Sequence, residues 1–120
     1  MAHSLIDRST WERWKQLESN GNPGFLRNLL DTFLNSTPND LTSLQTASRN
    51  MDLRSIVRLA HTLKSSCENL GILGPARMLY RIEKQARTLG RVDVTVVEDI
   101  AKDLRQALAE LKVDRDQMSS

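Results

Sequence analysis

The chain has 120 residues, of which 39% are hydrophobic and 27% are charged, a composition that indicates one globular domain and argues against disorder. Its net charge of +2 gives no indication of nucleic-acid binding, and its single cysteine excludes an internal disulfide. No apolar run is long enough for a membrane helix or a signal peptide, so we expect a cytoplasmic protein that does not insert into membranes.

A short helix is the first element that the sequence predicts. Ser9 and Glu12 have the spacing of a capping box, in which the two side chains bond to backbone N–H groups of the first turn. The turn-forming stretch SNGNPG, residues 19–24, then ends this helix. Its apolar face consists of Trp11, Trp14 and Leu17.

A long second helix follows. Asn22 and Pro23 are typical of a helix start, because asparagine caps the first turn and proline fits its geometry. Pro38 should kink or split this helix, but Leu41 and Leu44 continue the stripe in register beyond it. The pattern therefore favours one long bent helix over two short ones. Its stripe begins with Phe25, Leu26, Leu29, Leu30, Phe33 and Leu34.

Three more amphipathic helices complete the chain. Asp52 predicts the start of the third helix and Gly71 its end. Gly74 opens the fourth together with the following proline, Gly90 ends it, and the last helix starts at about Asp93. The stripe of the fourth helix is Met78, Leu79, Ile82, Ala86 and Leu89. The stripe of the last helix is Val94, Val97, Ile100, Ala101, Leu104, Leu108 and Leu111.

Helical periodicity extends along nearly the whole chain, without a strand pattern or an internal repeat. Each long helix has a single apolar stripe, and the connections are short. These features predict an all-α fold, an antiparallel up-and-down four-helix bundle with a short extra N-terminal helix. We expect one bundle domain over residues 1–120, with flexible ends at 1–8 and 114–120, and a monomer.

The third helix carries a histidine outside its apolar stripe. With about 100° per residue, one contiguous arc holds Leu53, Ile56, Leu59, Ala60, Leu63, Cys67 and Leu70. His61 lies roughly opposite the centre of that arc, so a core histidine is disfavoured. Either a surface histidine without a role or a functional imidazole remains. Its neighbours on the polar side are Arg54, Arg58, Lys64, Ser65 and Glu68.

Several kinds of catalytic or binding site are excluded by this placement. Cys67 points into the core, so it cannot form a nucleophilic pair with His61. The other histidine is His3, near the N-terminus, so a metal site with a normal set of ligands is unsupported. The sequence has no glycine-rich phosphate loop and no arrangement that suggests a Ser–His–acid triad.

An accessible imidazole beside a lysine is compatible with phosphoryl chemistry. The imidazole nitrogen is a competent nucleophile near neutral pH. Lys64, at position i+3 from His61, would lie on the adjacent surface and balance the charge of a phosphoryl group. Ser65 is small enough to let another protein approach the ring. Glu68 has the wrong charge for this role, but it lies two turns away.

The stretch LAHTLKSSCENLG, residues 59–71, resembles the signature of histidine-containing phosphotransfer (HPt) domains. That signature is roughly Ala-His-x-Leu-Lys-Gly-small-small-x-x-apolar-Gly. Ser65 departs from it, because the family usually has glycine there. Helix number, order and length, with a proline in the long second helix, extend the resemblance to most of the chain. The matching residues are Ala60, His61, Leu63, Lys64, Ser66, Cys67, Leu70 and Gly71.

The resemblance implies a phosphorelay protein. His61 would carry a phosphoryl group on Nε2 and pass it between aspartates of response-regulator receiver domains. The partners would be such receivers and a hybrid sensor histidine kinase. The family has no ATP site and is not a kinase, and the receiver would supply an acidic pocket and Mg²⁺. No cofactor or metal of its own is implied.

Two other functions remain open at this point. A helical adaptor could bind a receiver or kinase without accepting phosphate, although the His61–Lys64 pair argues against it. Nucleic-acid binding is weaker still, because the cations of the fourth helix are more simply a solvated face: Arg77, Arg81, Lys84 and Arg87.

A docking surface is also predicted around His61. By the helical wheel Val57 is an apolar residue on the polar side, one turn before His61. We expect Val57 to contact the partner, within a polar rim. The other expected partner-binding residues are Arg54, Arg58, Ser65 and Glu68.

Overall fold

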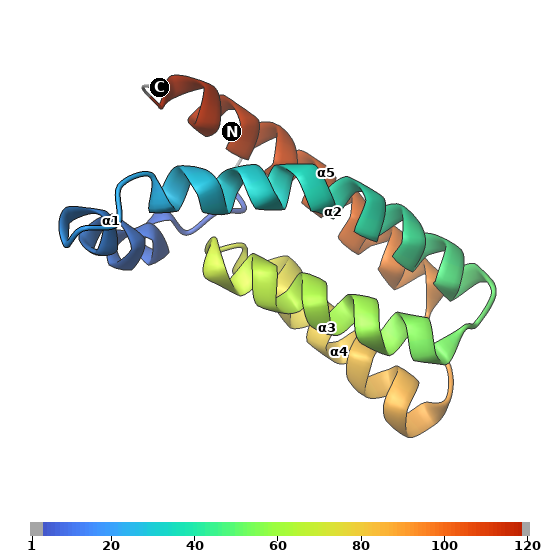
Figure 1. Ribbon diagram of the computed structural model, residues 1–120. Helices are drawn as coiled ribbons and strands as arrows, with labels where there is room; N and C mark the ends of the chain where they lie inside the picture. Colours follow the sequence, from blue (N-terminus) through green and yellow to red (C-terminus); the bar gives the residue numbers. More distant parts are fainter. Residues whose placement is uncertain (1–3, 119–120) are drawn as a thin grey trace.

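The described chain is entirely helical, as the sequence predicted. A computed structural model describes residues 4–118 (Figure 1). Its elements are the 3₁₀ turn η1 (Arg8–Thr10) and the helices α1 (Trp11–Ser19), α2 (Phe25–Arg49), α3 (Leu53–Asn69), α4 (Leu73–Leu89) and α5 (Val94–Gln117).

The four long helices form an antiparallel bundle. Helix α3 packs against α4 and α2, and α5 packs against α2 and α4, so that each long helix has two neighbours. Short turns join consecutive helices, while α1 lies across the end of the bundle where α2 begins (Figure 1). This arrangement confirms the predicted four-helix bundle with a short extra N-terminal helix.

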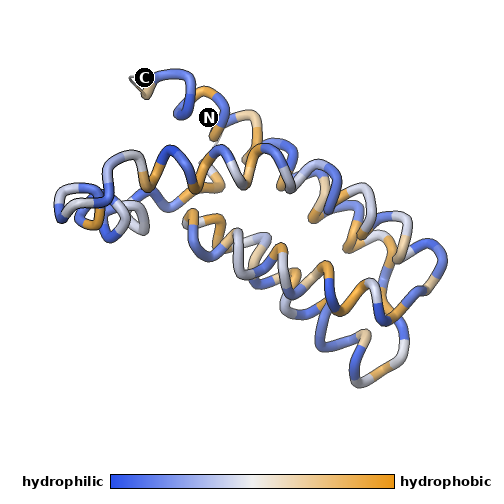
Figure 2. Tube along the Cα trace, in the orientation of Figure 1, coloured by the Kyte–Doolittle hydropathy of each residue, from blue (hydrophilic) through white to orange (hydrophobic). Residues whose placement is uncertain are grey.

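The core consists of the apolar stripes that the four helices turn toward one another (Figure 2). Complete burial of a large aliphatic side chain contributes about 1.5–3 kcal/mol, so these residues dominate the stability of the bundle. Leu89 was wrongly placed in the stripe of α4: it is 62% exposed, at the last residue of the helix. The largest fully buried side chains are Leu30, Leu41, Leu44, Ile56, Leu63, Leu70, Ile72, Leu79, Ile82, Ile100, Leu104 and Leu111.

Helix α2 runs without interruption through Pro38, which confirms one long helix. Its start was wrongly predicted: Gly24, with φ of 75°, precedes the first turn, instead of Asn22. The capping box of α1 is also absent, because Ser9 belongs to η1 and donates its N–H to the side chain of Asp7.

The predicted start and end of α3 are confirmed. The Asp52 side chain accepts hydrogen bonds from Ser55, and these bonds lower the pKa of Asp52. Beyond the last turn, Gly71 has a left-handed φ of 76°, which reverses the chain toward α4. Helix α3 is therefore held at both ends by residues that the sequence identified.

The N-terminal segment binds the C-terminal end of α3. Trp11 donates its indole N–H to the carbonyl of Leu70 at 2.9 Å, and Trp14 donates to Asn69 at 2.6 Å. The backbone N–H of Asp7 donates to the carbonyl of Gly71 at 2.8 Å. The two indole bonds satisfy carbonyls at the end of α3, which a helix leaves without intrahelical partners.

Parts of both chain ends expected to be flexible belong to this fold. Helix α5 continues to Gln117, and Asp114 within it lies 2.6 Å from the guanidinium of Arg8. Ile6 is buried in the core. The remaining end residues, 1–3 and 119–120, lie outside the described residues.

Candidate functional site

His61 lies in the middle of α3, with 58% of its side chain exposed. Its neighbours Ala60 and Leu63 are buried, because they belong to the apolar stripe. The histidine is therefore outside the core, as the helical wheel predicted, and it stands on a helix that is fixed by packing on its opposite face. A rigid helix suits a reactive side chain better than a loop does.

Glu83 of α4 is the one acidic partner of this histidine in the described residues. Its Oε1 lies 3.2 Å from His61 Nδ1, and only 10% of its side chain is exposed. The sequence reasoning missed Glu83, because a wheel drawn for one helix does not identify the residue that faces it from the next. A signal was present, since Glu83 directly follows a core residue, Ile82.

Arg87 binds the other oxygen of the same carboxylate. Its Nη2 and Nε lie 3.1 Å and 3.3 Å from Glu83 Oε2, one helical turn along α4. The buried carboxylate thus bridges an exposed imidazole and an exposed guanidinium. The sequence interpretation of Arg87 as part of a solvated face is therefore incomplete.

The carboxylate determines which imidazole nitrogen carries the proton. An ionised carboxylate only accepts hydrogen bonds, so the contact with Glu83 requires a proton on His61 Nδ1. In the neutral ring the lone pair is then on Nε2. Glu83 thereby orients the ring and fixes its tautomer, as second partners do for histidines at metal sites and in catalytic triads.

Lys64 stands one turn after His61 and is half-buried. Its ammonium group lies 5.2 Å from the centroid of the Tyr80 ring, a cation–π contact that holds it between α3 and α4. It forms no ion pair within residues 4–118, so its charge is free to meet an anion. A surface hollow of about 440 Å³ adjoins it, lined by Lys64, Glu68, Leu73, Ala76, Arg77 and Tyr80.

The residues predicted to dock a partner lie on the same face of α3 as His61, and one of them differs from the others in exposure. Val57 is half-buried and packs against the core, so it is less accessible than its position on the wheel suggested. The other four are exposed: Arg54, Arg58, Ser65 and Glu68.

Cys67 is inaccessible and takes no part in the site. Its side chain is fully buried, and this burial raises the pKa of the thiol to about 12. The thiolate is the reactive form of cysteine, so Cys67 is chemically inert at neutral pH. This agrees with the prediction that it points into the core.

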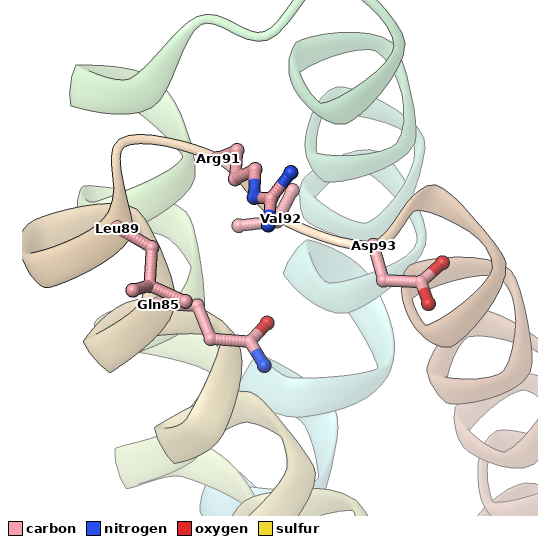
Figure 3. Close-up of a pocket in the computed structure, with 5 residues that line it drawn as sticks. All are labelled: Gln85, Leu89, Arg91, Val92 and Asp93. Atoms are coloured by element: carbon pink, nitrogen blue, oxygen red, sulfur yellow. The ribbon is translucent and has the colours of Figure 1, made fainter.

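A second hollow lies at the turn between α4 and α5 (Figure 3). It has a volume of about 350 Å³ and contains no histidine, cysteine or lysine. The side chain of Asp93 is already used to cap α5 through the N–H of Thr95. The hollow is lined by Gln85, Leu89, Arg91, Val92 and Asp93.

Residues 4–118 contain neither a group of potential metal ligands nor a membrane-spanning helix. No three side chains of the histidine, cysteine, aspartate and glutamate types converge there in a way that would hold a metal ion. None of the helices in that range combines the length and the apolar character that crossing a membrane requires.

Residues 28–117 match the Hpt domain when the chain is compared with known protein families. The chain belongs to the Hpt domain family. The match includes α3, α4 and α5 completely and most of α2, so it contains His61, Lys64 and Glu83. It confirms the family that the motif around His61 indicated.

The Hpt fold is also seen in a solved structure. The chain is similar to the crystal structure of histidine-containing phosphotransfer protein B (HptB) from Pseudomonas aeruginosa PAO1, with a TM-score of 0.81 and 20% sequence identity. The alignment covers 98% of this chain and 100% of that one, and at this identity it establishes the fold. No curated protein matches the chain.

Membership of the Hpt family confirms the predicted function class, histidine phosphotransfer in phosphorelay signalling. Hpt proteins are phosphocarriers rather than kinases, and they work with response regulators and kinases.

Proposed function

We propose that His61 is the residue of this Hpt domain that accepts and donates the phosphoryl group, through Nε2. The observation that carries the proposal is the exposed imidazole whose Nδ1 faces the buried carboxylate of Glu83 at 3.2 Å. A ring held in this way presents the lone pair of Nε2 to solvent. Lys64, on the adjacent turn, supplies a cation that forms no ion pair within residues 4–118.

The step exchanges one bond to phosphorus for another. The Nε2 lone pair attacks the phosphorus of a receiver's phosphoaspartate, the Nε2–P bond forms, and the P–O bond to aspartate breaks and releases a carboxylate. The ring keeps its Nδ1 proton and becomes positive, and Glu83 stabilises that charge. Lys64 meets the negative phosphoryl oxygens, while the receiver's acidic pocket and Mg²⁺ organise the transfer. The reverse step passes the group to the next receiver.

The proposal also covers the partner proteins, the oligomeric state and the docking surface. Its partners are receiver domains and a hybrid sensor histidine kinase, and residues 1–120 act as one monomeric, cytoplasmic Hpt domain without ATP-dependent kinase activity. A receiver must bring its aspartate to the His61 ring, so it also covers the surface around that ring. The docking residues are the half-buried Val57 and the exposed Arg54, Arg58, Ser65 and Glu68.

Labelling experiments test this function. We expect phosphoramidate, a small phosphoryl donor, and a phosphorylated receiver domain each to label the parent with an acid-labile, base-stable phosphate. His61→Gln should remain folded, because its side chain faces solvent, and should take up no phosphate. The control is His3→Gln, which should label like the parent. Full labelling of His61→Gln would disprove the assignment, and a parent that binds receivers but is never labelled would instead be an adaptor.

A further inference from the structure

Arg87 stands where it can control the carboxylate that holds His61. Glu83 uses its two oxygens separately: Oε1 lies 3.2 Å from His61 Nδ1, and Oε2 lies 3.1 Å from Arg87 Nη2. Both Glu83 and Arg87 are on α4, one turn apart, whereas His61 is on α3. The guanidinium thus occupies the oxygen that the imidazole leaves free.

The burial of Glu83 makes its partners important. A carboxylate with 10% of its side chain exposed needs a compensating charge or hydrogen bonds. Within residues 4–118, Arg87 is the only lysine or arginine in an ion pair with it. If Arg87 were removed, Oε2 would lose its cation, and the imidazole would be the remaining partner of a buried carboxylate. The carboxylate could then turn, and His61 Nδ1 would lose the fixed acceptor that orients the ring.

We propose that Arg87 is a positioning residue for phosphotransfer, an inference that rests on the proposed role of His61. Arg87 binds Oε2 of Glu83 and thereby directs Oε1 at His61 Nδ1, so that the ring keeps one orientation and one tautomer, with Nε2 free.

Arg87 also keeps Lys64 available for the phosphoryl group. Tyr80 holds the Lys64 ammonium on the same edge of α4 as Glu83, one turn earlier. An unoccupied Oε2 would be a competing anion for this lysine. Because Arg87 already binds Oε2, the Lys64 ammonium remains without an ion pair within residues 4–118.

A partner-free reaction tests the inference. In phosphoramidate the P–N bond breaks with release of ammonia as the Nε2–P bond forms, so the rate reports on the His61 site without a receiver. We expect Arg87→Gln to lower this rate on the order of tenfold, the effect of losing one positioning contact. Arg81→Gln is the matched control: Arg81 is exposed on the same helix and forms no ion pair within residues 4–118. Its rate should equal the parent's.

The ¹⁵N NMR spectrum of the imidazole separates positioning from a general structural effect. All proteins carry His3→Gln, so His61 is the sole histidine. At a pH where the ring is neutral, the parent should show its proton on Nδ1 alone, whereas Arg87→Gln should show a mixture of the two tautomers. Arg87→Lys should restore part of the rate and spectrum. In a Glu83→Gln background, Arg87→Gln should cause no further loss of rate, because its effect acts through Glu83.

The experiments distinguish a failure of the role of Arg87 from a failure of the role of His61. If Arg87→Gln matches Arg81→Gln in rate and spectrum, or still lowers the rate when Glu83 is already replaced, Arg87 does not act through Glu83 and the inference is wrong. If the folded parent takes up no phosphate from any donor, the role of His61 itself fails.

Discussion

Gly71, the last residue of the family motif, should be irreplaceable for a reason that the structure makes specific. Its φ is 76°, and a Cβ atom built there would overlap the backbone oxygen of Asp7. That oxygen belongs to backbone, so a side-chain rotation cannot relieve the overlap. Gly71→Ala must therefore displace the N-terminal segment from the end of α3.

The cost follows from three contributions. A left-handed backbone costs alanine about 1–2 kcal/mol. The hydrogen bond from Asp7 N–H to Gly71, now 2.8 Å long, contributes about 1 kcal/mol. Re-exposure of Ile6, which is 7% exposed, adds about 1.5–3 kcal/mol. We expect Gly71→Ala to lower the free energy of unfolding by about 4 kcal/mol.

Urea unfolding followed by circular dichroism and by tryptophan fluorescence measures this loss. Fluorescence reports on the segment directly, because the indoles of Trp11 and Trp14 bond to the end of α3. Gly74→Ala is the matched control, since nothing lies within 4 Å of its Cβ position and its φ is not left-handed. A Gly71→Ala variant within about 1 kcal/mol of Gly74→Ala would refute the steric argument.

Four further predictions concern the surface and the core. Lys64→Ala should slow phosphoryl transfer or shorten the lifetime of phosphohistidine. The melting temperature should change little, because the Lys64 ammonium forms no ion pair within residues 4–118. If the transfer rate and the lifetime are both unchanged, the proposed role of Lys64 is wrong. Val57→Ala should slow transfer from a receiver but leave phosphoramidate labelling unchanged. The melting temperature should drop slightly, because Val57 packs against the core. If both reactions lose rate equally, the substitution has distorted the site and Val57 is not a docking residue. Cys67 should resist iodoacetamide in the folded protein, and rapid alkylation would contradict its burial. Burial raises the pKa of this thiol from 9.0 to about 12. Its contribution to stability is therefore complete below pH 9 and is lost as the pH rises toward 12. Urea titrations of the parent and of Cys67→Ala at pH 8 and pH 10 measure this loss.

The sequence predicted those parts of the fold that depend on local chemistry. Asp52 and Gly90 mark helix boundaries because a carboxylate caps a first turn and glycine tolerates a left-handed φ. Where two candidate residues competed, the prediction failed: Asn22 is the better cap by type, but Gly24 supplies the left-handed turn before α2. Leu89 failed because it is the final residue of α4.

The candidate site could be predicted only in part, because some of its residues come from a second helix. His61 and Lys64 lie on one helix, so their spacing is enough to bring them together. Glu83 and Arg87 reach His61 through the packing of α4 on α3, and the register of two antiparallel helices is not encoded in either helix alone. Tyr80, which holds Lys64, was missed in the same way.

The position of the phosphoryl group on the imidazole tests the central claim most directly. A His3→Gln protein labelled with ¹⁵N in histidine and phosphorylated by phosphoramidate can be examined by ¹⁵N and ³¹P NMR, which distinguish the two ring nitrogens. We predict a single phosphohistidine, at Nε2 of His61, with Nδ1 still protonated and directed at Glu83. A phosphoryl group on Nδ1, or on any residue other than His61, would contradict the account.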